Sequence, residues 1–217
     1  MKTEKGIARL IPLEVSEETL KADLERYRQK ALEIGASQAK IVPAQWVKVD
    51  ERVRLKCMSP PCPHYGRVPF CPPNSAEPEF MRRVLGQFKW AVLFKADVPV
   101  EDFADVKRYY PHGQKHQRKA LEIAATVEVL AFSEGYYFAV GFGSGCCRDT
   151  LCSGGLCPMM DGGRCPYELM PRPSMESVGI DVFGLATKVG WDVYPIYRSV
   201  DPKLVPNAII VGVIFIY

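Results

Sequence analysis

The chain has 217 residues, of which 47% are hydrophobic and 24% are charged, and its formal net charge is +3. This composition is typical of a globular protein with a buried core, and the length favours a single domain over residues 1–217, at roughly 100–200 residues per domain. The charge is too small and too scattered for a nucleic-acid binder. The N-terminus lacks the apolar run of an export signal, and the most apolar stretch, residues 208–217, is shorter than the ~20 residues of a membrane span. We therefore expect a cytoplasmic protein with neither a membrane nor a nucleic acid as its partner.

The first half of the chain predicts two helices and two strands. Ser16 precedes two acidic residues, as a helix N-cap does, and apolar residues at helical spacing carry this helix to Gly35. Residues 39–49 predict a strand, residues 79–87 a short helix and residues 90–98 a second strand. Between them, residues 56–74 are rich in proline and cysteine, which excludes a regular helix or a central strand.

The second half predicts a helical turn at 101–110, a longer helix at 117–133 and an aromatic, β-branched strand at 136–142. A helix capped by Ser174 and ended by Gly190 follows, and then strands at 191–196 and 208–217. This order predicts an α+β fold. We expect an α/β sandwich with a mixed or mostly antiparallel sheet, which carries two cysteine-rich loops at one end.

All eight cysteines lie in these two loops. The first cysteine loop, residues 56–74, has the spacing C-x4-C-x8-C, and the second cysteine loop, residues 145–172, has the spacing C-C-x4-C-x4-C-x7-C. Thiols gathered in this way in a cytosolic chain indicate soft-metal ligation more often than disulfides. The candidate metal ligands are Cys57, Cys62, Cys71, Cys146, Cys147, Cys152, Cys157 and Cys165.

The last four cysteines of the second loop, from Cys147 on, make a complete set of ligands, whereas the first loop is one ligand short. Cys146 could supply this ligand across space, His64 could supply it, or the site could keep one open position. Two adjacent side chains rarely satisfy the same tetrahedral centre. We therefore expect Cys146 to complete the first set and Cys147 to belong to the second.

The spacing favours iron–sulfur clusters over zinc. Structural zinc sites usually contain pairs of cysteines separated by two to four residues. This chain has no C-x-x-C, and its spacing of four residues is the widest in that range. Iron–sulfur loops are wider and are often flanked by proline, and here a proline follows four of the cysteines: Cys62, Cys71, Cys157 and Cys165. We expect two [4Fe-4S] clusters, with zinc as the first alternative and redox-active thiols as the second.

Other residues near the loops are candidates for cofactor contacts. Gly143 and Gly145 could let the backbone approach a cluster and direct N–H groups at its sulfur atoms. Arg172, like other cations beside the loops, could stabilise a negative cluster. His112 and His116 lack the glutamate of a zinc-protease motif and have cations nearby, so we expect a solvated face there.

Several short motifs mark the two loops. They are V-R-L-K-C, C-P-H-Y-G and C-P-P in the first loop, G-C-C-x4-C in the second, and R-P-S-M-E-S-x-G-I-D-V-F after it. Together these segments resemble a family of predicted metal-binding proteins, domain of unknown function 2284, which is frequent in anaerobic archaea and bacteria. The resemblance covers about residues 53–189 and implies metal binding. The positions that match the cysteines of the family are Cys57, Cys62, Cys71, Cys147, Cys152 and Cys165.

Three functions follow as expectations. The first is an iron–sulfur electron carrier that acts with a redox partner protein. The second is an iron–sulfur enzyme with an open iron at the three-cysteine loop, and the third is a zinc-stabilised interaction module. The sequence indicates no catalytic residue.

Overall fold

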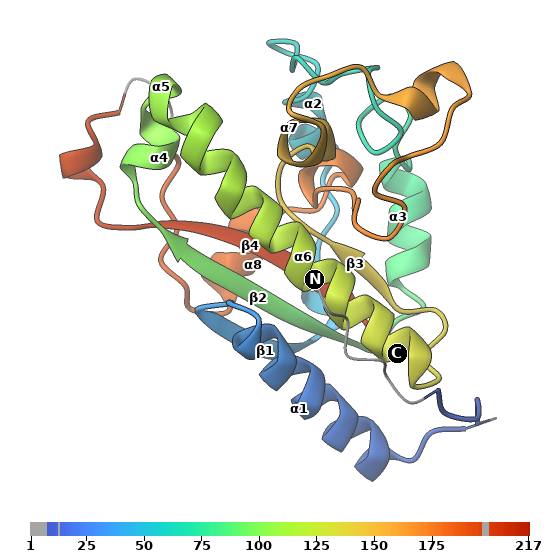
Figure 1. The fold of residues 1–217 in the computed structure, drawn as a ribbon. Helices are drawn as coiled ribbons and strands as arrows, with labels where there is room; N and C mark the ends of the chain where they lie inside the picture. Colours follow the sequence, from blue (N-terminus) through green and yellow to red (C-terminus); the bar gives the residue numbers. More distant parts are fainter. Residues whose placement is uncertain (1–7, 13, 197–199) are drawn as a thin grey trace.

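The structure is a computed structural model that describes residues 8–12, 14–196 and 200–217. The N-terminal residues 1–7, part of the stretch without an export signal, lie outside the described residues. A four-stranded sheet with the order β1-β2-β4-β3 forms its centre, and each neighbouring pair is antiparallel (Figure 1). Its strands are β1 (Gln38–Pro43), β2 (Trp90–Val98), β3 (Val140–Phe142) and β4 (Ala208–Phe215). The predicted α+β class is confirmed, and the sheet is antiparallel.

The two central strands supply both hydrophobic cores. β2 and β4 pair over eight residues, from Ala91 opposite Phe215 to Val98 opposite Ala208. Because side chains alternate along a strand, Phe94 packs on one face of the sheet and Leu93 on the other. Each face therefore requires its own layer of helices.

Two long helices, α1 (Glu17–Glu33) and α6 (Gln114–Ser133), cover the first face, while the short helices α3 (Pro78–Leu85) and α8 (Val182–Lys188) pack on the second. Figure 1 shows α6 running diagonally over β4 and β3. The remaining helices are α2 (Glu51–Leu55), α4 (Glu101–Ala104), α5 (Val106–Arg108), a π turn (Tyr109–Gly113) that leads into α6, and α7 (Cys147–Cys152). Short 3-10 turns lie at Ala44–Trp46, Pro158–Asp161, Glu176–Val178 and Pro202–Leu204. Among the described residues, no helix is long and apolar enough to cross a membrane.

Several predicted elements are found with small shifts. The Ser16 hydroxyl accepts a hydrogen bond from the Thr19 N–H at 3.1 Å, as expected for the N-cap of α1. The strand predicted at 90–98 is β2, and the last strand ends two residues early. The first cysteine loop contains no helix or strand in the structure, as its prolines predict.

Two predicted strands are shorter than expected. The prediction of a strand over 39–49 is wrong beyond Pro43, where a 3-10 turn begins and Asp50 then caps α2 through the Arg52 N–H. The strand predicted over 136–142 is limited to its last three residues. Tyr136 packs instead with its ring edge on Tyr27, so tertiary contacts outweigh the β propensity of this segment.

The segment after the second cysteine loop also differs from expectation. The Ser174 hydroxyl accepts a hydrogen bond from the Ser177 N–H at 3.2 Å and so caps only a 3-10 turn, which ends at Gly179 with φ +87°. Asp181 then caps α8. The predicted single helix is therefore wrong, and so is the strand at 191–196, where the buried Trp191 indole donates to the Gln38 side chain at 2.8 Å.

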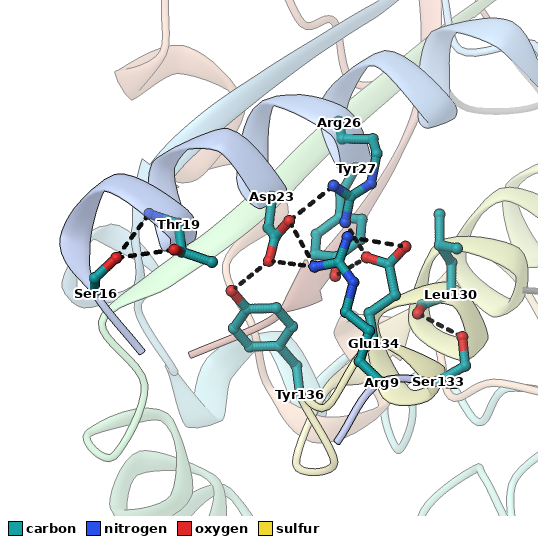
Figure 2. Close-up of polar contacts among 10 residues, drawn as sticks. All are labelled: Arg9, Ser16, Thr19, Asp23, Arg26, Tyr27, Leu130, Ser133, Glu134 and Tyr136. Carbon is teal, nitrogen blue, oxygen red and sulfur yellow. Dashed lines mark hydrogen bonds and ion pairs between the residues drawn. The ribbon is translucent and has the colours of Figure 1, made fainter. Parts of the chain in front are cut away.

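A buried carboxylate ties the N-terminal segment to α1 and to the end of α6 (Figure 2). Asp23 accepts hydrogen bonds from Arg9 at 3.2 Å and from the Tyr136 hydroxyl at 2.9 Å, and it forms an ion pair with Arg26 at 2.8 Å. Arg26 also forms an ion pair with Glu134. Burial, together with the bond to Asp23, raises the pKa of Tyr136. The hydroxyl therefore stays protonated and remains a donor.

Replacing Tyr136 with Phe removes this donor and leaves the ring in place. We expect the free energy of unfolding to fall by about 2 kcal/mol, as for a hydrogen bond to a charged group. Urea denaturation measures the change. Tyr137→Phe is the matched control. Tyr137 is 48% exposed, so this variant should lose little free energy of unfolding. Equal losses in the two variants would contradict the role of Asp23 as the partner of Tyr136.

Candidate metal centre

The two cysteine loops meet at one end of the molecule (Figure 1). The Cys71 thiol in the first loop lies 3.9 Å from the Cys146 sulfur in the second. A second contact joins the Asn74 amide to the Met160 sulfur at 3.8 Å. The loops are separated by more than 70 residues in the sequence, so the fold itself brings the two groups of cysteines together.

Helix α6 sets the position of the second loop. A Cβ atom on Gly143 would lie 2.7 Å from Cδ2 of Leu121, and one on Gly145 would lie 2.4 Å from the Gln117 side chain. Gly145 also has φ +74°, a conformation that favours glycine. Both glycines are therefore explained by close packing on α6, and their predicted contact with a cofactor stays a prediction.

Arg172 likewise binds α6. Its guanidinium donates two hydrogen bonds to the Glu128 carboxylate, at 2.7 and 2.9 Å, and it also donates to the carbonyls of Leu169 and Pro171. This bidentate pair fixes the end of the second loop. The predicted role of Arg172 at a cofactor remains a prediction.

Four thiols of the second loop surround one small cavity. Cys147, Cys152, Cys157 and Cys165 line it, together with apolar groups that include Phe70 of the first loop. The same region forms a minor apolar core, in which Leu121 of α6 packs with residues of both loops. The structure therefore gathers the four cysteines that the spacing assigns to the second set.

The donor set of four thiols suits a thiophilic metal. Among the described residues, no three His, Cys, Asp or Glu side chains form a group that could hold a metal ion. The cavity has a volume of about 20 Å³, the space of about one water molecule. Beside the cavity, residues 153–165 of the second loop are largely exposed and rich in glycine.

Cys146 is the electrostatic centre of the two loops. Hydrogen bonds from the Cys147 and Cys71 thiols, and then from His64, lower its pKa far below that of a free cysteine. Hydrogen bonds to Cys146 and burial raise the pKa values of Cys71 and Cys147. The thiolate is the form of cysteine that ligates metals, and the surroundings of Cys146 favour it.

Electrostatic effects link the thiols of both loops, because the charge of Cys147 adds to the rise in the pKa of Cys71 and that of Cys146 adds to the rise in the pKa of Cys152. The charges of Cys157 and Cys152 add to the rise in the pKa of Cys147. Cys71 is influenced by Cys62 as well as by Cys146. In the same way, burial raises the pKa of Cys57 first and the charge of Cys62 adds to it.

Two polar groups beside the thiols were missed by the sequence reasoning. Asp149 lies on α7, and its carboxylate is 2.9 Å from Nε2 of His64. The bond to Asp149, followed by the one to Cys146, raises the pKa of His64 to about 10. The charge of Glu176 adds to the rise in the pKa of Cys57, and burial raises the pKa of the Glu176 carboxyl itself. The position of Asp149, three residues after Cys146 on one turn of α7, is the signal that could have identified it.

The remaining candidates lie elsewhere. His116 pairs with the buried carboxylate of Asp102 at 3.0 Å, and His112 is exposed. The expected solvated face is therefore found at His112, whereas His116 is half-buried and hydrogen-bonded to Asp102.

Mild oxidation of the metal-free protein should join Cys71 to Cys146, because their sulfur atoms are 3.9 Å apart. Peptide mapping under non-reducing conditions identifies the product. Cys71→Ser should abolish this crosslink, whereas Cys57→Ser should leave it intact. A crosslink confined to cysteines of one loop would contradict the contact between the loops.

No curated protein and no solved structure gives a significant match. One family model, described as predicted metal-binding protein (DUF2284), matches residues 40–211, which is wider than the resemblance seen in the motifs and covers both cysteine loops. The chain therefore belongs to the DUF2284 family of predicted metal-binding proteins.

Proposed function

We propose that the chain binds two iron–sulfur clusters, one in each set of four thiols, and transfers electrons. The observation that carries the proposal is the contact of Cys146 with Cys71 at 3.9 Å, while the adjacent Cys147 lines the cavity of the second set. Membership of a predicted metal-binding family supports metal binding. The spacing of the cysteines and the prolines that follow four of them favour iron–sulfur over zinc.

The residues of the chain would contribute in three ways. Eight thiolates would hold the clusters, which supply one-electron transfer when bound. The Tyr167 N–H donates to the Cys165 sulfur at 3.4 Å, and bonds of this kind set the potential of a cluster. Because Cys146 and Cys147 are neighbours, ~3.8 Å apart at Cα, the two centres would lie close enough to exchange electrons.

An electron carrier needs a redox partner protein. Lys56, Arg67 and Arg164 are exposed on the cysteine loops, so the partner we propose presents acidic groups to this end of the molecule. We place the exchange in the cytoplasm, where thiols remain reduced.

A zinc-stabilised module is the second candidate, because one distance favours it. Thiolates on a single tetrahedral zinc, with Zn–S bonds of about 2.3 Å, lie about 3.8 Å apart. The sulfur atoms of Cys71 and Cys146 are 3.9 Å apart, and the cavity lined by the second set of thiols is small. We favour an iron–sulfur enzyme with an open iron less, because Cys146, 3.9 Å from Cys71, would complete the first set in this proposal.

Composition of the protein purified without oxygen tests the proposal. We expect about eight iron and eight sulfide per chain, with brown colour and broad absorption near about 400 nm. Metal and acid-labile sulfide assays measure this. Tightly bound zinc without sulfide would replace the iron–sulfur proposal with the second candidate.

The assignment of Cys146 and Cys147 to different centres is tested by two single variants. Cys146→Ala should reduce the iron content and disturb the spectrum of one centre, because the first set loses a ligand. Cys147→Ala should disturb the other centre. Electron paramagnetic resonance of the reduced variants distinguishes the two spectra. Loss of the same signal in both variants would show that the adjacent cysteines serve one centre, and an intact spectrum in Cys146→Ala would point to His64 or to an open iron.

A further inference from the structure

A cavity without any cysteine, the α3 cavity, lies between α3 and the segment that joins β1 to α2. Its volume is about 350 Å³, at the lower end of the roughly 300–1,000 Å³ of small-molecule sites. The buried side chains of Ala44, Val47 and Leu85 line it. The exposed side chains of Lys48 and Arg82 line it as well. The cavity therefore combines an apolar surface with two cations.

The R-P-S-M-E-S-x-G-I-D-V-F motif holds the α3 cavity together. The Asp181 N–H donates to the carbonyl of Lys48 at 2.9 Å, and Ile180 pairs with Val49 as an antiparallel bridge. A Cβ atom on Gly179 would lie 3.2 Å from the Val49 side chain and 3.4 Å from the first residue of α3. The motif thus packs against both sides of the cavity, a role that the metal centre does not explain.

The charges at the α3 cavity favour an anion. The Lys48 ammonium has no ion-pair partner among the described residues. Arg82 donates from Nε to the Val49 carbonyl at 3.3 Å and from Nη2 to the Glu51 carboxylate at 2.9 Å, which leaves Nη1 without a described partner. With Glu51 included, these side chains carry a net charge of +1. This charge outweighs the partial negative charge, about half a unit, at the C-terminal end of α3.

We propose that the α3 cavity binds a small organic anion, which has an apolar body the size of one ring and a single carboxylate. The body covers Ala44, Val47 and Leu85, and its removal from water supplies affinity. The carboxylate accepts charge-assisted hydrogen bonds from the Lys48 ammonium and from Nη1 of Arg82, and its charge matches the net charge of the side chains. This site is independent of electron transfer and of the metal.

Benzoate is the probe for this site, and benzamide, which has the same ring without the charge, is its neutral counterpart. Isothermal titration calorimetry of the full chain purified without oxygen should show one saturable site for benzoate, with a Kd on the order of 1 mM. Benzamide should bind at least about tenfold more weakly, because it cannot form the charge-assisted hydrogen bonds. Absence of saturable benzoate binding well above that concentration would overturn the proposal, and so would equal affinities for the two probes.

Two substitutions locate the site by charge and by shape. Lys48→Gln should weaken benzoate binding about tenfold, since it removes the unpaired ammonium. Gly86→Leu should abolish it, because Gly86 lines the cavity and a larger side chain would fill the space. The substitution suits the backbone, since Gly86 has φ −65° and a Cβ atom there would meet its nearest neighbours at 3.5 Å. Circular dichroism checks that both variants fold.

Lys203→Gln is the matched control, because it removes an equal charge from the exposed turn at Pro202–Leu204. It should bind benzoate as the wild type does. Wild-type affinity in both Lys48→Gln and Gly86→Leu would place benzoate elsewhere and overturn the proposal. An equal loss of affinity in Lys48→Gln and Lys203→Gln would show an effect of net charge alone and would overturn it as well.

Discussion

The antiparallel pairing of β2 with β4 is the constraint on which the other features depend. Both faces of these strands are buried, so a shift of the register by one residue would place each side chain in the wrong core. The pairing therefore fixes which face receives α6 and which receives α3 and α8. It also fixes the path of β3, which pairs with β4 and leads directly into the second cysteine loop.

Helix α6, which is held on the sheet, in turn fixes both ends of the second cysteine loop at the candidate metal centre. Gln117, Leu121 and Glu128 recur along one stripe of the helix, and they contact Gly145, Gly143 and Arg172 in turn. The start and the end of the second loop are thus held on one rigid element. Between these points lie the largely exposed residues 153–165, which include Cys157 and Cys165. This combination holds the loop in place and still leaves its interior able to adjust to a bound group.

The sequence predicted those features that depend on local chemistry. The N-cap at Ser16, the strand at 90–98 and the irregular first loop follow from capping, alternation and proline, and all three are found. The predicted helix from Ser174 failed because Gly179 adopts a positive φ and Ile180 pairs with Val49, a contact that no local pattern contains.

The same limit applies to the candidate site. The grouping of thiols was visible as spacing, and the family assignment agrees with metal binding. The pair of His64 with Asp149 joins residues that are far apart in the sequence, so only the packing of the two loops reveals it. That residues 1–217 form one domain stays a prediction.

The edges of the sheet bear on how another protein could bind. β1 at one edge carries Lys40 and ends at Pro43, which has no N–H to donate, and β3 at the other edge offers only three residues. Short strands, lysine and proline discourage the addition of a further strand. Association by extension of the sheet is therefore disfavoured at both sides.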